Sequence, residues 1–487
     1  MNIIYLNGPF NKKAFSRSSR SPAVTKSGTI YYPIWLAYAA GVAQQRLHSD
    51  TEKINIELLD AAARKFNARE TVQYLQASPP DIVFCDTSTP SIYEDIITAG
   101  AIKEAFQDCK VIMVGTHATA MACDVLNADQ RIDAVARGEY DITSMEICQA
   151  VLNGKSIENV DGISYRSGDQ IINNPDRELI SDLDSLPFVS SVYKKFLNVR
   201  DYVFSAAQFP MIMIITSRGC TNRCKWCLYP QVMHRGKYRM RSPENIAAEF
   251  AYIAKELPDV REIGIEDDLF TGDLKRLRKT CELLIEQGNQ IDFWCDTRVD
   301  LDFETMQLLK KAGCRLLVAG FESGDEEILK NINKRATVQQ GREFMANARK
   351  AKLLVHGCFV FGNPGETPEL MQKTLDMAIE LDPDTAQFFP VIVYPGTQMY
   401  SWAEENKYLN TTNFNKWLTP QGMHNSVVDL PGLKGCDVVG FCDHARRSFY
   451  LRRKYIVKKF IQSISNPHEA KRNIKGFCKV ARHLVKK

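Results

Sequence analysis

Three cysteines lie close together in one short stretch of the sequence: Cys220, Cys224 and Cys227. This stretch directly follows an apolar run, Met211–Ile215. Thiolate sulfur is the usual protein ligand of iron–sulfur clusters, and three thiols on one short loop can reach three corners of one cluster. A set of three thiols without a nearby fourth leaves one iron open, and a small molecule can bind there.

Other interpretations of the three cysteines are weaker. A zinc site needs a fourth Cys or His close by, and His234 lies seven residues after Cys227. A disulfide framework is disfavoured because three is an odd number and the chain has the character of a cytosolic protein. The flanking Arg218-Gly219 and the tryptophan between the last two cysteines argue against scattered core cysteines. An iron–sulfur cluster is the favoured interpretation.

The cysteine loop resembles the cluster-binding motif of the radical S-adenosylmethionine (SAM) superfamily, and its surroundings resemble the branch that carries an N-terminal cobalamin-binding domain. The resemblance implies a four-iron four-sulfur cluster on Cys220, Cys224 and Cys227, whose open iron binds the amino and carboxylate groups of SAM. One electron from the cluster would then cleave SAM to a 5′-deoxyadenosyl radical.

The likeness extends over nearly the whole chain. Four short sequence segments resemble those of one subgroup of the family. This subgroup includes the hopanoid-biosynthesis-associated radical SAM proteins and the anaerobic magnesium-protoporphyrin monomethyl ester cyclase. These segments are Thr87–Pro90, Asp161–Tyr165, Leu186–Val189 and Leu228–Gln231. Because one layout serves several chemistries, the subgroup does not decide the reaction.

Length and composition predict a cytoplasmic protein of about three domains. The chain has 487 residues, with 45% hydrophobic and 25% charged residues, which is ordinary for a globular protein. The first residues have no basic region before an apolar core, so they predict a strand and not a signal peptide. The longest nearly apolar run, Tyr31–Ala43, is too short to span a bilayer. The other cysteines are dispersed, which fits a reducing compartment.

Residues 1–155 alternate short apolar strands with helices, which predicts a doubly wound parallel sheet covered on both faces. The predicted strands are Ile3–Leu6, Ile54–Leu59, Asp81–Cys85, Lys110–Gly115 and Ala134–Ala136. Ligands bind such sheets at the carboxyl ends of the strands. The chain has no G-x-G-x-x-G motif and no P-loop, so a dinucleotide or a nucleoside triphosphate is disfavoured.

The resemblance assigns cobalamin to these strand ends. It implies contacts from Thr87, Ser88, Thr89, Gly115, His117, Gly138 and Glu139. The sequence departs from the better-known cobalamin motif because the loop Asp60–Arg64 offers no His. We therefore expect cobalamin with its own base detached and no histidine ligand from this loop. For His117, a hydrogen bond that orders its loop is the favoured role.

Residues 156–205 predict a linker with a hairpin, Gly162–Tyr165 and Gln170–Ile172, around the turn Ser167-Gly168-Asp169. Residues 206–400 predict six strand–helix units. The strands are Met211–Ile215, Glu262–Ile265, Phe293–Cys295, Leu316–Ala319, Gly357–Phe361 and Thr385–Val393. Six units are too few for a closed eight-unit barrel, so an open partial barrel is expected. Residues 401–487 predict a helical, basic C-terminal region.

Polar residues follow the six strands of the predicted barrel, where active residues of such folds gather. SAM carries an ammonium, a carboxylate and a ribose, which suit carboxylates, an arginine and close backbone approach by glycine. By resemblance, Glu266, Asp267 and Asp268 are assigned to the ammonium, Glu322 and Ser323 to the ribose or carboxylate, and Gly362 and Pro364 to the adenine. Arg298 and Lys334 are further candidates. No catalytic acid or base is predicted.

The predicted reaction is hydrogen abstraction from an unactivated carbon of a secondary metabolite or lipid, followed by methyl transfer from methylcobalamin. Oxidative cyclisation or ring rearrangement with the same cofactors is the alternative. A tRNA-modifying enzyme is less favoured, because the basic tail has few aromatic residues for base stacking. A non-catalytic corrinoid carrier would not need the cysteine loop. The expected partner is an external electron donor of the flavodoxin or ferredoxin type, and no nucleic acid.

The charge of the chain is uneven. From Ala445 to Lys487 there are fourteen Lys or Arg residues against one acid, Glu469. A basic helical region of this kind can touch anionic lipid, so peripheral membrane contact is an open alternative. A solvated face docked on the barrel is the favoured interpretation. Cys436, Cys442 and His444 could form a second metal site, but a structural role is favoured because a fourth ligand is missing.

Overall fold

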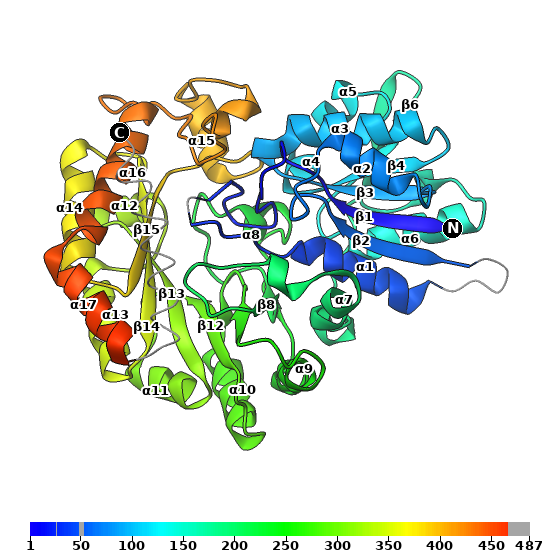
Figure 1. Ribbon diagram of the computed structural model, residues 1–487. Coiled ribbons are helices and arrows are strands. Elements are labelled where there is room, and N and C mark those ends of the chain that lie inside the picture. The colour runs from blue at the N-terminus through cyan, green and yellow to red at the C-terminus, as the bar shows by residue number, and fades with distance from the viewer. Residues whose placement is uncertain (26, 48–52, 466–487) are drawn as a thin grey trace.

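A computed structural model describes residues 1–25, 27–47 and 53–465 of the chain. It contains two sheets that lie side by side, each covered by helices (Figure 1). The segment between the first strand and the first helix runs between the two sheets together with the short helix α8 (Leu228–Val232). Within the described ranges, no helix is both long and apolar enough to cross a membrane.

The first sheet has seven strands in the order β2-β1-β3-β4-β5-β6-β7. The strands β2, β1, β3, β4 and β5 pair in parallel, and β6 and β7 are added in antiparallel orientation. Their bounds are β1 Asn2–Asn7, β2 Asn55–Asp60, β3 Ile82–Thr87, β4 Lys110–Gly115, β5 Ala134–Ala136, β6 Ile163–Ser167 and β7 Gln170–Asn173. The doubly wound sheet is confirmed. The predicted hairpin is also present, and it forms the last two strands of this sheet.

The second sheet has six strands in the order β15-β14-β13-β12-β11-β8, all parallel. Their bounds are β8 Met211–Ile214, β11 Glu262–Ile265, β12 Asp292–Thr297, β13 Cys314–Glu322, β14 Leu354–Phe361 and β15 Thr385–Pro390. The ladder runs from β8 to β15 without closing on itself. The predicted partial barrel is confirmed, with β8 and β15 as its two edges.

Helices cover both sheets. Those of the first unit are α1 Ile34–Arg46, α2 Ala68–Leu75, α3 Ile92–Ala105, α4 Thr116–Ala120, α5 Ala122–Ala128 and α6 Asp141–Leu152. Those that accompany the second sheet are α7 Val189–Phe196, α9 Pro243–Glu256, α10 Leu274–Glu286, α11 Phe303–Lys311, α12 Glu326–Asn331, α13 Val338–Lys350 and α14 Pro368–Leu381. The C-terminal helices are α15 Gln398–Glu405, α16 Gly435–Tyr450 and α17 Arg453–Ser465, and α16 packs on β15.

The helices of the partial barrel begin where the sequence supplies an N-cap. Ser242 precedes α9 and accepts a hydrogen bond from the Asn245 N–H, with Pro243 at the first helical position. Thr367 and Pro368 start α14 in the same way. A short polar side chain satisfies a free N–H of the first turn, and proline has no N–H to lose there. These local signals mark where the two helices begin.

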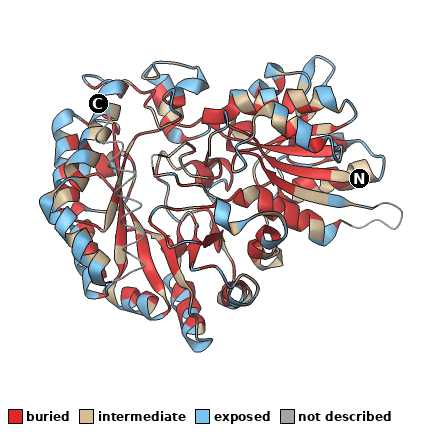
Figure 2. Ribbon diagram, in the orientation of Figure 1, coloured by how far each residue is buried: buried red, intermediate tan, exposed pale blue. Residues whose placement is uncertain are grey.

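The cores are formed by the strands themselves. Every residue of β3 and β8 is buried (Figure 2). A strand that is buried on both sides of its sheet must be apolar throughout and not alternating. This pattern places the polar residues at the strand ends, so the chemistry of both sheets lies at their carboxyl edges.

Candidate active site

The three cysteines of the loop line one wall of a cavity of about 1850 Å³. The loop follows β8 and a two-residue strand, β9 (Ser217–Arg218), which pairs with β10 (Arg239–Met240). The side-chain amide of Gln231 donates to the carbonyls of Cys224 at 3.3 Å and of Cys227 at 2.7 Å, which fixes the loop's turn. The predicted thiols are therefore brought together at the open edge of the second sheet.

The thiols differ in acidity. A hydrogen bond from Cys227 lowers the pKa of Cys224 to about 6, and the nearby cations of Lys334 and Arg298 act in the same direction. Burial raises the pKa of Cys220. Among the described residues, no three Cys, His, Asp or Glu side chains are gathered tightly enough to hold a single metal ion.

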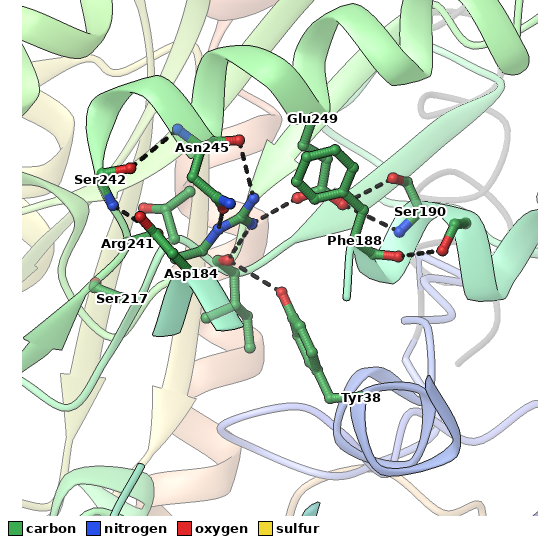
Figure 3. A network of polar contacts seen from close by, with 12 residues as sticks. Tyr38, Asp184, Phe188, Ser190, Ser217, Arg241, Ser242, Asn245 and Glu249 are labelled. Atoms are coloured by element: carbon green, nitrogen blue, oxygen red, sulfur yellow. Dashed lines mark hydrogen bonds and ion pairs between the residues drawn. The ribbon is translucent and has the colours of Figure 1, made fainter. Parts of the chain in front are cut away.

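A buried polar network supports the strand that leads into the loop (Figure 3). The Ile215 carbonyl accepts hydrogen bonds from Tyr38 Oη at 3.1 Å and from Arg241 Nη1 at 3.0 Å. Arg241 also pairs with Glu249 at 2.5 Å, and Glu249 accepts from both the N–H and the hydroxyl of Ser190. Because Tyr38 lies on α1, this network joins the first unit to the base of the cysteine loop.

Asp267 does not lie in the cavity, which corrects its assignment to the SAM ammonium. It is fully buried and accepts hydrogen bonds from the N–H and the hydroxyl of both Thr216 and Ser217, at 2.5 to 3.0 Å. These two residues link β8 to β9. Asp267 therefore braces the backbone before the cysteine loop, and has no oxygen left for a ligand's ammonium.

Glu266 and Asp268 do line the cavity, together with Asp296, which ends β12. An arginine that the sequence did not suggest lies among these three carboxylates: Arg20. Its guanidinium is 2.8 Å from Glu266, 3.4 Å from Asp296 and 3.9 Å from Asp268. Burial and the crowding of acids raise the pKa of Asp296 well above its ordinary value. We call Glu266, Asp268 and Asp296 the acidic trio.

A second polar group lines the same cavity, at the end of the neighbouring strand β13. Lys334 Nζ lies 2.7 Å from Glu322 Oε1, and both line the cavity with Arg298. Arg298 is positioned by Asp300 at 3.1 Å and by the Arg335 carbonyl at 2.6 Å. The structure thus brings three of the predicted SAM residues, Glu322, Arg298 and Lys334, to the same space as the thiols.

Three other predicted residues lie outside the cavity lining, which corrects their assignments. Ser323 is buried against the Thr374 hydroxyl, 3.2 Å away. Gly362 and Pro364 belong to a loop that Glu366 holds, since Gly362 N donates to Glu366 Oε2 at 2.6 Å. A Cβ on Gly362 would meet Val438 of α16 at 3.1 Å, so its close approach is to a helix and not to adenine.

The carboxyl edge of the first sheet is closed by the protein itself. Arg17, from the connecting segment between β1 and α1 (residues 8–25 and 27–33), is 2% exposed there. It pairs with Asp95 at 2.6 Å and donates to the Gly8 carbonyl and the Ser91 hydroxyl. The cavity at this edge, lined in part by Arg17, Thr87 and Gly115, measures about 10 Å³.

Five of the residues predicted to bind cobalamin at this edge are buried: Thr87, Ser88, Thr89, Gly115 and His117. The polar side chains among them are bonded to protein atoms. Thr87 donates to the Val114 carbonyl at 2.7 Å. Ser88 and Ser91 share a hydrogen bond of 2.8 Å. His117 Nδ1 lies 3.0 Å from the Thr89 hydroxyl. Burial lowers the pKa of His117 to about 3, so its ring is neutral and orders the loop, as the sequence predicted. A Cβ on Gly115 would meet Asp86 and the backbone of Thr87, so this glycine serves the fold.

Glu139 and Gly138 connect the first sheet to the cysteine loop. Arg218 pairs with Glu139 at 3.1 Å and with both oxygens of Asp141, and His234 Nδ1 lies 2.6 Å from Glu139. Burial would raise the pKa of Glu139, but Arg218, His234 and Arg239 outweigh it and hold that pKa well below its ordinary value. The Gly138 N–H donates to the Thr119 hydroxyl. We call Glu139, Asp141 and Arg218 the clamp.

The clamp reaches the active cavity through one histidine. His234 Nε2 lies 3.4 Å from Asp268 of the acidic trio, while its other ring nitrogen faces Glu139. All of these side chains are at least nine-tenths buried. His234 Nε2 makes no hydrogen bond with a described residue, so the two sheet edges approach each other at this histidine without a bond between them. The sequence could not reveal this approach because the residues are far apart along the chain.

Comparison with known families agrees with this geometry. Residues 214–378 match the Radical SAM superfamily, and residues 20–147 match the B12 binding domain. The first match contains all three cysteines, the trio, and Glu322, Arg298 and Lys334. The chain is a B12-binding radical SAM protein.

Relatives of this B12-binding radical SAM protein carry out more than one reaction. It is 29% identical to an uncharacterized methyltransferase of Pyrococcus horikoshii, over 93% of this chain and 95% of that one. It is 26% identical to the anaerobic magnesium-protoporphyrin IX monomethyl ester cyclase of Rubrivivax gelatinosus, over 76% of this chain and 65% of that one.

Two solved structures share the fold. The radical SAM methyltransferase TsrM from Kitasatospora setae has a TM-score of 0.66 at 17% identity, over 89% of this chain and 80% of that one. The cobalamin-dependent radical SAM enzyme OxsB has a TM-score of 0.69 at 13% identity, over 98% of this chain and 72% of that one. Both likenesses support the arrangement of a Rossmann-like sheet beside a partial barrel.

The cofactors of the protein are a four-iron four-sulfur cluster, SAM and cobalamin. The second sheet fits the first two: its carboxyl end presents three thiols, four carboxylates and, with Arg20, three cations around one large cavity. The first sheet, in the state seen here, does not fit a corrin. Its predicted contact residues are engaged with protein atoms, and the cavity of about 10 Å³ is smaller than one water's share of liquid. No cobalamin contact is therefore assigned to a residue.

Proposed function

We propose that this radical SAM enzyme is a methyltransferase that acts on a carbon atom of a small secondary metabolite or a lipid. One observation carries the proposal: the thiols, the acidic trio and the pair Arg298 and Lys334 surround a single cavity of about 1850 Å³. Typical ligand pockets measure about 300 to 1,000 Å³, so the space admits SAM together with a second molecule of similar or larger size. The methyltransferase relative, which is aligned over almost its whole length, favours methyl transfer.

When bound, the cluster would supply one electron, and SAM a carbon radical and a methyl group. The chain's own residues hold these groups in place. Cys220, Cys224 and Cys227 would ligate three irons. Glu266 and Asp268 would accept hydrogen bonds from the SAM ammonium, and Arg298 and Lys334 would hold its carboxylate, since ionised partners make the stronger hydrogen bonds.

The walls of the cavity protect the reacting groups. Val318, Val360 and Phe388 line it between the thiols and the amino ends of the strands. Apolar walls keep water away from reactive intermediates and strengthen the charged contacts inside. Trp294 also lines the cavity and is 1% exposed, and its indole N–H has no hydrogen-bond partner among the described residues. A buried donor of this kind is available to a polar atom of the substrate.

An oxidative cyclisation is the second candidate. It is favoured by the similarity to the anaerobic cyclase, which covers 76% of this chain. Because the chain spans 65% of that relative's length, the likeness supports the shared layout more than the shared reaction. The two candidates differ in whether a methyl group enters the product.

An external electron donor would reduce the cluster. On the cysteine loop, Arg223 is exposed and Lys225 is half-buried. Two cations beside the cluster ligands favour an acidic partner such as a flavodoxin-type protein, because complementary charge speeds encounter. A double charge reversal, Arg223→Glu with Lys225→Glu, should slow reduction by flavodoxin but not by dithionite.

The test of the proposed function uses the reconstituted protein under anaerobic conditions. It is incubated with cell extract, a reductant and SAM that carries a trideuteriomethyl group, and the products are analysed by mass spectrometry. Methyl transfer predicts a product that contains deuterium from the label. An unlabelled product that has lost hydrogen would instead establish the cyclisation candidate.

A further inference from the structure

The active cavity continues far beyond the space around the thiols. It is lined at one end by the cysteine loop and at the other by Thr385 and Ala386, which begin β15. Pro390 and Ile392, near the carboxyl end of the same strand, also line it. From Thr385 to Pro390 the strand rises about 17 Å at about 3.3 Å per residue. The cavity is therefore an elongated space that runs along the inside of the open barrel.

The two ends of the cavity carry opposite charge. The lining at the carboxyl end contains the acidic trio and Glu322 against Arg20, Arg298 and Lys334, four acids to three cations. The lining at the amino end contains four cations against one acid, Asp443. These cations are Arg261, Arg446, Arg447 and Lys459. Arg261 precedes β11 and Lys459 lies 3.8 Å from Asp384 before β15, so both lie at the amino ends of the strands, whereas Arg446 donates to the Phe388 carbonyl partway along β15.

Two of these cations are available to a ligand. Arg447 is exposed on the last turn of α16 and makes no ion pair with a described residue. The side chain of Arg261 likewise makes no ion pair within the described part of the chain, and it is exposed. In contrast, Arg446 pairs with Asp443, and Lys459 pairs with Asp384. The amino end of the cavity thus has an excess positive charge that no acid among the described residues neutralises.

The opening at this end has an apolar rim. Tyr450 is anchored to Ala386, at 2.9 Å from its N–H and 2.6 Å from its carbonyl, which holds the end of α16 against β15 (Figure 1). On α17, Ile456 and Phe460 line the cavity and are nevertheless 43% and 66% exposed. Phe209 lines it from the opposite side and is 44% exposed. A water-soluble polar substrate would gain nothing from such a rim.

We propose that this cavity binds an anionic amphiphile: a long apolar chain that extends toward the cluster, with a phosphate or carboxylate group at Arg447 and Arg261. The inference rests on the proposed function, since it names the substrate class for the same site. Apolar walls give the binding free energy through burial, and the two arginines select the charged end by bidentate hydrogen bonds. The exposed apolar residues of α17 continue the rim, so the amphiphile enters between α17 and Phe209.

Binding to the full-length, cluster-reconstituted protein with SAM tests this inference. The probes are decyl phosphate, decanol and inorganic phosphate, used below micelle-forming concentrations and followed by calorimetric titration. Decyl phosphate should bind at least tenfold more tightly than decanol, and inorganic phosphate should bind weakly. Arg447→Gln combined with Arg261→Gln should weaken decyl phosphate about tenfold or more and leave decanol unchanged. Equal binding of the alcohol, tight binding of inorganic phosphate, or no effect of the double variant would each overturn the proposal.

Two further variants separate the apolar and charged contributions. Phe460→Ser, at the exposed rim, should weaken decyl phosphate and decanol by the same factor. Lys454→Gln is the matched control, because Lys454 is 79% exposed on α17 and lies outside the cavity lining. It should change neither affinity. An effect of Lys454→Gln equal to that of the arginine variants would show a diffuse charge effect and contradict the proposed site.

The source of the amphiphile and the proposed function are distinguished by separate readouts. Co-sedimentation with phosphatidylglycerol vesicles, lost at high salt, would identify a bilayer as the source, whereas decyl phosphate binding without co-sedimentation would identify a dissolved metabolite. Both outcomes support the proposed ligand class. Formation of 5′-deoxyadenosine reports the radical chemistry independently. Normal formation of 5′-deoxyadenosine without decyl phosphate binding would overturn only the substrate class. Decyl phosphate binding without formation of 5′-deoxyadenosine would overturn only the proposed function.

Discussion

The carboxyl edges of the two sheets are built from similar residues and yet are in opposite states. Both edges end in glycine, serine, threonine and acidic residues, and both face the same region between the sheets. At the second sheet these residues surround a cavity of about 1850 Å³, whereas at the first sheet the cavity measures about 10 Å³. The connecting segment accounts for the difference: Arg17 enters the first edge, while Arg20, three residues later, reaches only part of the second.

This difference teaches that polar strand ends identify an edge where a ligand can bind, but not whether the edge is open. Each arginine of the segment compensates buried acids, one for Asp95 and one for the acidic trio. The connecting segment thus contacts the carboxyl edges of both sheets. Its position decides how much of either edge is available to a cofactor.

Loss of the clamp should have the largest effect, a decrease in the free energy of unfolding. Arg218→Met would leave Asp141 buried without its cation and Glu139 with only Arg239 and His234, which costs about 3–5 kcal/mol of the free energy of unfolding. Urea denaturation measures the loss. Arg235→Met removes a cation that is 40% exposed and 3.7 Å from Asp176, and should cost at most about 1 kcal/mol. Equal losses for the two variants would show that the clamp does not hold the edges together.

The buried Asp86 at the closed first edge should make the stability of the protein depend on pH. Burial raises the pKa of Asp86 to about 7. In the unfolded chain Asp ionises near pH 3.9, so between about pH 4 and pH 7 the folded state binds more protons, and stability falls as pH rises through this window. Asp86→Asn should remove this fall and be more stable than the wild type at pH 8, by at most about 4 kcal/mol.

Chemical denaturation at a series of pH values measures the Asp86 effect. Asp169→Asn, on the exposed turn between β6 and β7, is the matched control and should stay within about 0.5 kcal/mol at every pH. A wild-type stability that rises from pH 4 to pH 7 relative to Asp86→Asn would contradict the buried, protonated state of this carboxyl.

Release of the connecting segment should open the first edge to cobalamin. Arg17→Met with Asp95→Leu replaces a buried ion pair by apolar residues, which is often tolerated without loss of stability. If the pair holds the edge closed by about 1.4 kcal/mol, the affinity for cobalamin should rise about tenfold. Spectrophotometric titration measures it. Lys12→Met with Glu70→Leu removes an exposed pair between the same segment and α2, and should leave the affinity for cobalamin unchanged. Unchanged affinity in both variants would show that the segment does not compete with cobalamin.

The smallest effect is expected at Arg20. Its guanidinium, 34% exposed, lies where a SAM ammonium would meet Glu266 and Asp268. Arg20→Gln should free these carboxylates and tighten SAM binding a few-fold, measured by equilibrium dialysis with reconstituted protein. Weaker binding would mean that Arg20 itself contacts SAM. Lys12→Gln is the control, because it removes another cation of the connecting segment, and it should leave SAM binding unchanged.

The sequence predicted the fold well because its signals are local. Runs such as Met211–Ile214 and caps such as Ser242 act within a few residues, and so do the three cysteines. The SAM-binding roles assigned to Asp267, Ser323 and Gly362 were wrong for one reason. The partners of these residues are determined by tertiary packing. Arg20 lies 246 residues before Glu266, and no sequence pattern in its serine-rich loop predicts this contact. Side-chain direction at a strand end is decided by what packs against it.

The most direct test of the central claim is the formation of 5′-deoxyadenosine from SAM by anaerobically reconstituted, reduced protein. The wild type should hold about four irons per chain and form 5′-deoxyadenosine. The triple variant Cys220→Ala, Cys224→Ala, Cys227→Ala should lose both, while Cys123→Ala with Cys436→Ala, two exposed cysteines elsewhere, should keep both. Formation of 5′-deoxyadenosine by the triple variant would contradict the assignment of these thiols as the ligands of a SAM-cleaving cluster.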